Sequence, residues 1–452
     1  MKRHVIVGRF GNSDRVEIPT THGELATRLD FVAAWRRLDH DIGSALDALS
    51  KMVVFPSEIG LDLLVLATHI HAADTRISRS TESQDGWTRE IRIVAPVSEP
   101  TRWNTAVPLL ERLTNFLTGD RWTIGFRARP AGFERAVHPR PRHLIRPPFD
   151  ALALFSGGLD SLIGAIDLLE AGRTPLLISH AGDGATSDAQ NTLVHALKKN
   201  YPRRSFDRLR LWMDLRNWSV KDVQVEKTTR GRSFLFFAIG VFAGTGLDGD
   251  FVLRAPENGL IALNVPLDPL RLGAYSTRTT HPFYIARWNE LMGMLGIPGR
   301  IENPYWDKTK GEMVVSCRNR DLLANLAPQS LSCASPTKGR WQGLSIGHCG
   351  FCMPCLIRRA ALLGIDDGTT YAVADLTADE ISTREARGQQ IRSFQYAIER
   401  IRRNPKVAAL EIYKPGPLSD ESPARRTALA DVHRRGLAEV ARFLATVRTV
   451  PE

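Results

Sequence analysis

The stretch that decides the fold is Leu152-Ala153-Leu154-Phe155-Ser156-Gly157-Gly158-Leu159-Asp160-Ser161. The apolar run 151–155 predicts a buried parallel strand, and the apolar period that follows Ser161 predicts a helix that ends at Gly172. A strand, a glycine turn and a helix in this order direct backbone N–H groups and the positive end of a helix dipole toward an anion. Because Gly157 and Gly158 lack a Cβ atom, a phosphate can approach their backbone closely. The stretch therefore predicts a loop that binds pyrophosphate, in preference to an ordinary β–α turn capped by a serine.

Two better-known catalytic loops do not fit this stretch. A Walker loop needs Gly-Lys at the start of the helix, and that dipeptide does not occur in the chain. The nucleophile elbow of serine hydrolases needs a glycine two residues before the serine, where Leu154 stands. The loop resembles instead the PP-loop of enzymes that split ATP between the α- and β-phosphates and transfer AMP to a carbonyl or carboxylate oxygen. This resemblance implies that ATP and its Mg²⁺ are bound at Phe155, Ser156, Gly157, Gly158, Leu159, Asp160 and Ser161.

Composition places the chain among globular proteins. Its 452 residues suffice for two or three domains, and 43% hydrophobic and 24% charged residues are ordinary values for a soluble protein. The longest apolar run, 234–243, is too short to span a membrane, and the first residues do not resemble a signal peptide, so we expect a cytoplasmic protein. The net charge of +11 is spread along the chain without a basic run, so nucleic-acid binding is not favoured.

The sequence divides into three units. The sequence of residues 1–145 predicts an N-terminal α+β domain, with partner binding as its candidate role. Its expected strands are at 5–7, 61–68, 88–97 and 122–128, and its expected helices are at 29–52 and 107–117. In this unit His69, His71 and Asp74 are expected at the surface rather than on a metal. The proline-rich segment 129–148 predicts a linker or strap.

Residues 150–360 predict a doubly wound parallel sheet with strands at 151–155, 176–179, 209–215 and 251–253. A capping box at Ser187 is expected to open the helix that runs to Lys199. The glycines of 244–249 match a dinucleotide fingerprint but follow a predicted helix and precede a strand, which is the reverse of the required order. Residues 361–452 predict a peripheral helical extension, with helices at 380–403 and 422–447.

Four of the five cysteines form a spaced set. They are Cys333, Cys349, Cys352 and Cys355. In a reducing compartment, four thiolates at this spacing can surround Zn²⁺ tetrahedrally. Ferredoxin-type iron–sulfur motifs also contain C-x₂-C-x₂-C, but they continue with a nearby fourth cysteine followed by proline, whereas here the fourth lies upstream. The set favours structural zinc over an iron–sulfur cluster or unliganded thiols, and the remaining Cys317 is expected to be buried.

The order of motifs resembles one family. The loop is followed by Gly231-Arg232-Ser233, by Pro304 with Lys310-Gly311-Glu312, and by the cysteine set that ends with Cys355 and Arg358. This order is similar to the QueC family, the 7-cyano-7-deazaguanine synthases of the PP-loop superfamily, whose fold is of the adenine nucleotide alpha hydrolase type. The resemblance covers about residues 150–360. It implies that Lys310 contacts the phosphates or the adenylate, that Arg232 lines the active site and that the four cysteines hold Zn²⁺.

The chain departs from the housekeeping members of that family. Arg230 and Ser233 replace the usual Pro and Asn around the Gly-Arg pair, and the N-terminal unit and the helical extension are additions. The enlarged pattern is similar to the QueC-like subunits of bacterial anti-phage operons, in particular the QatC component of Qat systems, which implies a partner protein from the same operon. A distinct substrate loop between 257 and 282 suggests that Glu257, Asn258, Thr277 and Arg278 contact substrate.

These observations lead to three functional hypotheses. The first is an enzyme that adenylates a carboxylate, on a deazaguanine-type base, and passes it to ammonia or to an amine of a partner protein. The second is an ATP-binding scaffold subunit of a defence complex without turnover. The third, a tRNA-modifying PP-loop enzyme, ranks lowest because thiolation needs a sulfur-carrying cysteine near ATP and only Cys317 is spare. Asp160, Lys310 and Arg232 together favour catalysis.

Overall fold

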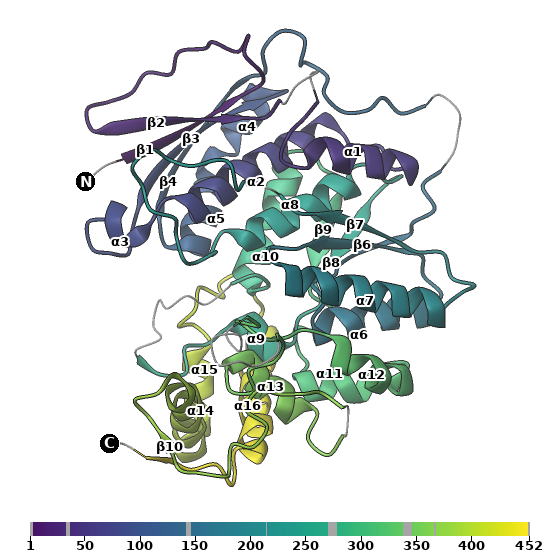
Figure 1. Ribbon diagram of the computed structural model, residues 1–452, viewed down its shortest axis with the longest axis vertical. Helices are drawn as coiled ribbons and strands as arrows, with labels where there is room; N and C mark the ends of the chain where they lie inside the picture. Colours follow the sequence, from purple (N-terminus) through teal and green to yellow (C-terminus); the bar gives the residue numbers. More distant parts are fainter. Residues whose placement is uncertain are drawn as a thin grey trace.

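The computed structural model describes residues 3–32, 37–141, 146–213, 215–269, 278–337, 346–365 and 368–450. The protein is α/β, and its described residues form a four-stranded and a five-stranded parallel sheet, a short two-stranded parallel sheet near the C-terminus and a group of C-terminal helices. In Figure 1 the first sheet lies at the top, the second in the middle and the C-terminal helices at the bottom. No helix within the described ranges is both long and apolar enough to cross a lipid bilayer.

The first sheet has the strand order β2-β1-β3-β4, and each of its strand pairs is parallel. The strands are β1 (Arg3–Arg9), β2 (Glu24–Asp30), β3 (Glu90–Val97) and β4 (Arg121–Ala128). The helices of this part are α1 (Ile42–Lys51), α2 (Glu58–Arg76), α3 (Arg79–Glu82), α4 (Pro100–Thr105) and α5 (Val107–Thr118). The strands predicted at 5–7, 88–97 and 122–128 and the helix predicted at 107–117 are confirmed. Because all four strands are parallel and helices connect β2 to β3 and β3 to β4, the unit is α/β rather than the predicted α+β.

Two predictions in the first unit are wrong. The segment 61–68, predicted as a strand, belongs to helix α2, which begins after the N-cap Ser57. This helix packs on β3 on one side and on α8 (Arg232–Gly244) on the other, so it is buried nearly all round and shows no amphipathic period. The helix predicted at 29–52 is divided between β2 and α1, because Leu29 and Phe31 continue a strand whose Phe31 N–H donates to Arg9 O at 2.8 Å.

The second sheet has the strand order β7-β6-β5-β8-β9 and is parallel throughout. Its strands are β5 (Ala151–Leu154), β6 (Pro175–His180), β7 (Asp207–Leu211), β8 (Phe251–Arg254) and β9 (Gly299–Glu302). The chain moves outward from β5 through β6 to β7 and then returns to the other side of β5 with β8. The carboxyl ends of β5 and β8 therefore flank a topological switch point, where doubly wound sheets bind ligands. The four predicted strands are confirmed, whereas β9 was not predicted.

The helices of the second unit are α6 (Leu159–Glu170), α7 (Gly184–Asn200), α8, α9 (Gly259–Leu263), α10 (Pro282–Met294), α11 (Lys310–Ser316) and α12 (Arg320–Leu326), followed by a 3-10 turn (Ala327–Gln329). Helix α7 begins one turn earlier than predicted. Its N-cap is Asp183, which accepts from Thr186 N at 2.8 Å, so the predicted capping box at Ser187 is wrong. The glycines of 244–249 lie between the end of α8 and the start of β8. A dinucleotide-binding loop would instead follow a strand and precede a helix, so the prediction that these glycines are not such a loop is confirmed.

The C-terminal part consists of α13 (Met353–Ala361), β10 (Ile381–Ser382), α14 (Ala386–Arg403), a 3-10 turn (Pro405–Val407), α15 (Ala408–Glu411), α16 (Pro423–Phe443) and β11 (Thr449–Val450). The two long helices confirm the predicted helical segments. The expectation that they are peripheral is wrong, because α16 packs against α9 and α13. Figure 1 shows α16 rising from the bottom of the molecule toward α9.

One hydrophobic cluster extends through both sheets. Leu66 of α2 and Ile93 of β3 belong to the same cluster as Leu152 of β5 and Phe237 of α8. The predicted boundary near residue 145 falls in a segment whose described residues, 129–141 and 146–150, contain no helix or strand. The first unit is therefore attached through a shared core as well as through the chain.

Candidate functional site

The loop after β5 has the geometry of an anion-binding turn. Gly157 lies in the left-handed region at φ +83°, and a Cβ atom there would come within 3.1 Å of Gln190 Cγ. Gly158 N donates to Ser156 Oγ at 3.3 Å, and Ser161 Oγ donates to Gly158 O at 2.9 Å. The first turn of α6 leaves backbone N–H groups without intrahelical acceptors, at the positive end of the helix dipole. The loop can therefore hold a phosphate group against exposed Ser156.

A segment far along the chain fixes this loop. Leu331 N donates to Gly157 O at 2.8 Å, and Leu159 N donates to Ser332 Oγ at 3.3 Å. Ser332 is followed directly by the first cysteine of the predicted metal set. Ser332 was not among the predicted site residues, because a serine between ordinary loop residues carries no distinguishing pattern.

Asp160 is the centre of a buried polar group at the switch point. Its Oδ1 accepts from Lys310 Nζ, and its Oδ2 accepts from Asn258 N at 3.1 Å and from Asn258 Nδ2 at 2.7 Å. Asp160, Asn258 and Lys310 are each less than a tenth exposed. The structure thus brings together three of the predicted site residues from α6, the loop after β8 and α11. The carboxylate and the ammonium group neutralise one another.

Lys310 is placed by a capped helix start. Thr309 and Glu312 form a capping box, with Glu312 N donating to Thr309 Oγ1 at 3.1 Å and Thr309 N donating to Glu312 Oε2 at 2.9 Å. Glu439 of α16 adds a second cap, because it accepts from Thr309 Oγ1 at 2.6 Å and from Gly311 N at 3.0 Å. The C-terminal helix therefore contributes directly to the position of Lys310.

Arg232 lies at the start of α8, beside the end of β6. Its Nη2 donates to His180 O at 3.3 Å. Burial and the charge of Arg232 lower the pKa of His71 to about 4 and hold the pKa of His180 well below its usual value, so both imidazoles are neutral at pH 7. Among the described residues Arg232 forms no hydrogen bond or ion pair with Asp160 or Lys310, so the two predicted catalytic cations have separate partners.

The N-terminal unit holds the turn that precedes Arg232. Asp74 of α2 accepts from Gly231 N at 2.6 Å, and the same carboxylate pairs with Arg89 at 3.0 Å and with Arg79 at 3.3 Å. His69 and Asp74 are buried, which corrects the expectation of a surface site. They and His71 belong to no metal-ligand group in the described part of the chain, where the cysteine set is the group that qualifies.

The four residues predicted to contact substrate lie in different environments. Asn258 is fully buried, and both polar atoms of its side chain are engaged, Nδ2 with Asp160 and Oδ1 with the N-terminus of α9, so it is placed to support the site rather than to contact a substrate. Arg278 Nη1 donates to Phe116 O of α5 at 2.6 Å, and its guanidinium lies 4.6 Å from the centre of the Phe116 ring. Thr277 lies outside the described residues.

Glu257 remains next to the predicted catalytic residues. Its Oε2 accepts from the Thr280 hydroxyl. Burial, together with the negative charge of Asp160, raises the pKa of Glu257 to about 7, against the opposing effect of Lys310. Asn303, at the end of the unpredicted strand β9, holds the Glu257 backbone, with Nδ2 donating to Glu257 O at 2.7 Å.

Comparison of the chain with protein-family models, with curated proteins and with solved structures found no match.

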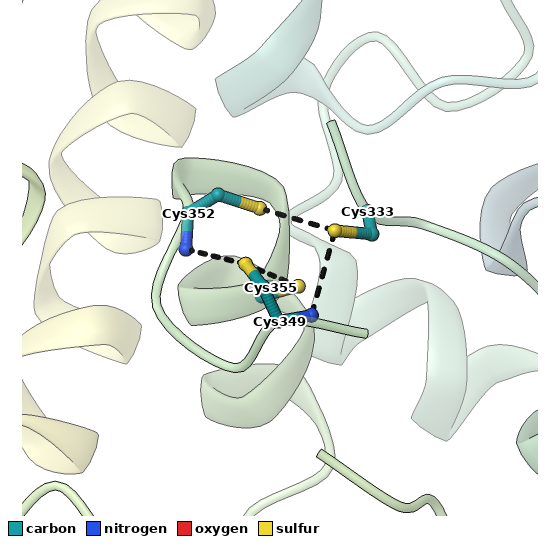
Figure 2. A group of neighbouring side chains, drawn as sticks. All are labelled: Cys333, Cys349, Cys352 and Cys355. Atoms are coloured by element: carbon teal, nitrogen blue, oxygen red, sulfur yellow. Dashed lines mark hydrogen bonds between the residues drawn. The ribbon is translucent and has the colours of Figure 1, made fainter. Parts of the chain in front are cut away.

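The four predicted cysteines form a candidate metal centre (Figure 2). Their sulfur atoms all lie within 4.8 Å of one another, with Sγ–Sγ distances of 3.9 Å for Cys333–Cys352 and for Cys349–Cys355. A tetrahedral ion with metal–sulfur bonds of about 2.3 Å separates its sulfur ligands by about 3.8 Å. A disulfide would require about 2.05 Å. The set can therefore hold a metal ion such as zinc.

Local backbone geometry presents these thiols to one point. Gly350 lies at φ +89° in the turn after Cys349, and a Cβ atom there would come within 2.4 Å of Val373 O. Cys349 N donates to Cys333 Sγ at 3.5 Å, and Cys352 N donates to Cys349 Sγ at 3.3 Å, as the dashed lines in Figure 2 show. Such N–H···S bonds stabilise thiolates at a metal. Cys317 lies elsewhere and is buried, as predicted.

A cavity of about 1100 Å³ lies between α9, the cysteine set and α14. Its walls include Leu260, Ile261, Cys352, Phe394 and Tyr396. Because Asn258 is the N-cap of α9, a molecule in this cavity would rest against the helix whose start holds Asp160.

Proposed function

We propose that the chain is a PP-loop ligase or synthase that uses ATP to adenylate a carboxylate, with AMP and pyrophosphate as products, and then transfers the acyl group to a nitrogen nucleophile. The observation that carries the proposal is the Asp160–Lys310 pair beside the Ser156–Gly158 loop, at the switch point of a doubly wound sheet. The motif order supports a carboxylated deazaguanine as the acyl substrate. It also supports ammonia, or an amine of a partner protein in anti-phage defence, as the acceptor.

Each residue in the pair has a chemical role in this reaction. Lys310 carries the charge that a leaving pyrophosphate needs. Asp160 has the carboxylate oxygens that Mg²⁺ prefers as ligands. In this structure one Asp160 oxygen binds Lys310 and the other binds Asn258. Arg232, at the end of β6, supplies a second cation that is already desolvated by its surroundings, and this burial lowers its pKa.

The four cysteines fit a structural zinc. One of them, Cys333, directly follows Leu331 and Ser332, which form hydrogen bonds with the loop after β5. A metal at these thiols would fix the chain direction at Cys333. In this proposal the zinc takes no part in the chemical steps.

One observation favours a second function, an ATP-binding scaffold without turnover. The Asp160–Lys310 pair is closed and buried, and a pair that stays closed when ATP binds would leave neither residue for catalysis. The two functions differ in whether the α–β bond of ATP is broken.

Isotope exchange between pyrophosphate and ATP separates these functions. The purified protein is incubated with ATP, Mg²⁺ and a carboxylated deazaguanine, and the return of labelled pyrophosphate into ATP is followed. We expect exchange that depends on the acid, together with AMP rather than ADP as the nucleotide product. ATP binding without exchange would support the scaffold function, and ADP with phosphate would contradict the proposed reaction.

A further inference from the structure

Glu257 is held in position by several elements at the switch point. Asn303, after β9, binds the Glu257 main chain on both sides, with Nδ2 donating to Glu257 O at 2.7 Å and Glu257 N donating to Oδ1 at 3.3 Å. The Thr280 hydroxyl donates to Glu257 Oε2. The neighbouring Thr279 hydroxyl lies 2.7 Å from the hydroxyl of Ser233, on the helix that carries Arg232. The carboxylate is therefore fixed relative to both predicted catalytic cations.

The charge environment of Glu257 differs from that of the other carboxylates around the site. Asp160 is paired with Lys310, Glu312 with Arg435 and Glu302 with Arg254. Within the described ranges no cation forms an ion pair with Glu257. Its charged neighbours are Asp160 of α6 and Lys310 of α11, which already neutralise each other.

This environment gives Glu257 the properties of a proton acceptor at neutral pH. Burial raises its pKa to about 7, and the charge of Asp160 contributes to the rise. The residue as a whole is partly exposed, whereas its carboxyl group is desolvated by the surrounding protein. An acid or base is most effective when its pKa is near the working pH.

We propose that Glu257 is the general base that accepts the proton of the nitrogen nucleophile in the second half of the reaction. This inference rests on the proposed function. The nitrogen lone pair forms the bond to the acyl carbon, and the bond between that carbon and the AMP oxygen breaks. AMP leaves with the electron pair, and one N–H proton passes to a Glu257 carboxylate oxygen. No oxidant or reductant is needed.

The other charged groups at the site are less suited to this step. Both Asp160 oxygens already accept hydrogen bonds, from Lys310 and from Asn258. Lys310 is a cation in an ion pair with Asp160. Thr280 keeps Glu257 Oε2 as an acceptor, which leaves Oε1 for the nucleophile.

The test separates the two half-reactions in Glu257→Gln. The first is pyrophosphate–ATP exchange with a carboxylated deazaguanine, and the second is AMP release after ammonium is added. We expect exchange within about twofold of wild type and AMP release lowered by about a hundredfold or more, because general bases contribute about 10²–10⁴-fold. The matched control is Glu302→Gln, which removes a carboxylate from the end of the adjacent strand β9 and should leave both rates unchanged.

Hydroxylamine sharpens the comparison, since it is largely unprotonated at neutral pH and attacks acyl adenylates without base assistance. We expect it to restore most of the acyl transfer in Glu257→Gln. Equal loss of exchange and transfer would overturn the inference, because Glu257 would then act in adenylation or in folding. Unchanged transfer with ammonium would also overturn it. Absence of exchange in the wild type would contradict the proposed function itself, and this inference would fall with it.

A second measurement does not depend on turnover. The native pKa of Glu257 lies above its unfolded value, so its ionisation should lower wild-type stability as the pH rises from about 4.5 to about 7. Glu257→Gln cannot ionise, so its thermal unfolding midpoint should match wild type near pH 4.5 and exceed it above pH 7. A pH-independent difference between the two proteins would show that Glu257 is an ordinary carboxylate and would overturn the proposal.

Discussion

At the scale of single residues, the site depends on charges that neutralise one another. Asp160 is buried beside Lys310, and its second oxygen is satisfied by Asn258. The motif resemblance predicts that Asp160 and Lys310 lie near ATP, but the sequence did not indicate that the Asn258 side chain binds Asp160. A fully buried amide whose nitrogen and oxygen both bind neighbouring protein groups supports the site.

Asp160→Asn should abolish pyrophosphate exchange and should also lower stability. The substitution leaves the Lys310 ammonium buried without its partner, which costs about 3–5 kcal/mol. Thermal or urea unfolding measures this cost. In the double variant Asp160→Asn/Lys310→Met the unpaired charge is gone, so stability should partly return while exchange stays absent. Exchange at the wild-type rate in Asp160→Asn would contradict the assigned role.

Arg278→Ala should affect stability more than substrate selection. The Arg278 guanidinium donates a hydrogen bond to the main-chain oxygen of Phe116 and lies over the Phe116 ring. Losing both interactions should cost about 1–3 kcal/mol in urea unfolding. Arg278→Lys should recover only part of this, because lysine lacks the planar group. If Arg278→Ala had wild-type stability and a raised KM for the acyl substrate, the result would support a role of Arg278 in substrate binding.

At the scale of elements, the ends of helices carry the site. Helix α6 begins at the phosphate loop, α8 begins at Arg232 and α11 begins at Lys310. Two of these starts are held from outside the second sheet: Asp74 of α2 binds the turn before α8, and Glu439 of α16 caps α11. The added N-terminal and C-terminal parts therefore position the predicted catalytic residues as well as enlarging the molecule.

Glu439→Gln should loosen the start of α11 without removing any group from the site itself. The carboxylate accepts from Thr309 Oγ1 and from Gly311 N, and weakening charged hydrogen bonds of this kind costs about 1.5–3 kcal/mol. Hydrogen exchange of the 310–316 amides should accelerate, and exchange of pyrophosphate into ATP should slow. The control is Glu399→Gln, which alters an exposed pair on α14. Unchanged hydrogen exchange would show that the Thr309–Glu312 box suffices.

At the scale of the whole molecule, a shared core and a candidate metal centre join distant parts of the chain. The first sheet and the second sheet contribute to one hydrophobic cluster. The cysteine set connects the segment at Cys333 with the start of α13, and the residues just before Cys333 hold the phosphate loop. Folding of the site should therefore depend on the metal.

Cys352→Ser should lower stability before it alters chemistry. The purified protein should contain about one zinc per chain and show no iron-type visible absorbance. Because metal binding is coupled to folding, the variant or a chelator should reduce the zinc content and the unfolding midpoint together. Cys317→Ser is the matched control, since this thiol lies outside the set. A stable, fully active Cys352→Ser protein without zinc would contradict a structural metal.

Local patterns accounted for part of the fold and part of the site. The strand and loop of 151–161 and the four cysteines are specified by residues that are adjacent or closely spaced, so their geometry follows from the sequence. The segment 61–68 was misassigned because α2 is buried on both sides, between β3 and α8, and such burial removes the helical period. Strand β9 was missed because its sequence, Gly-Arg-Ile-Glu, contains a single apolar residue, whereas the equally short β5 is wholly apolar.

The sequence by itself determined that a glycine loop opens a helix after a buried strand, and that four thiols can converge. Tertiary structure alone decided that Asp160 meets Lys310, that Glu439 caps the helix of Lys310, and that Glu257 has no cationic partner among the described residues. The physical reason is range. A turn or a metal-ligand spacing depends on neighbours in the chain, whereas the pairing and pKa of a buried charge depend on residues brought together only by folding.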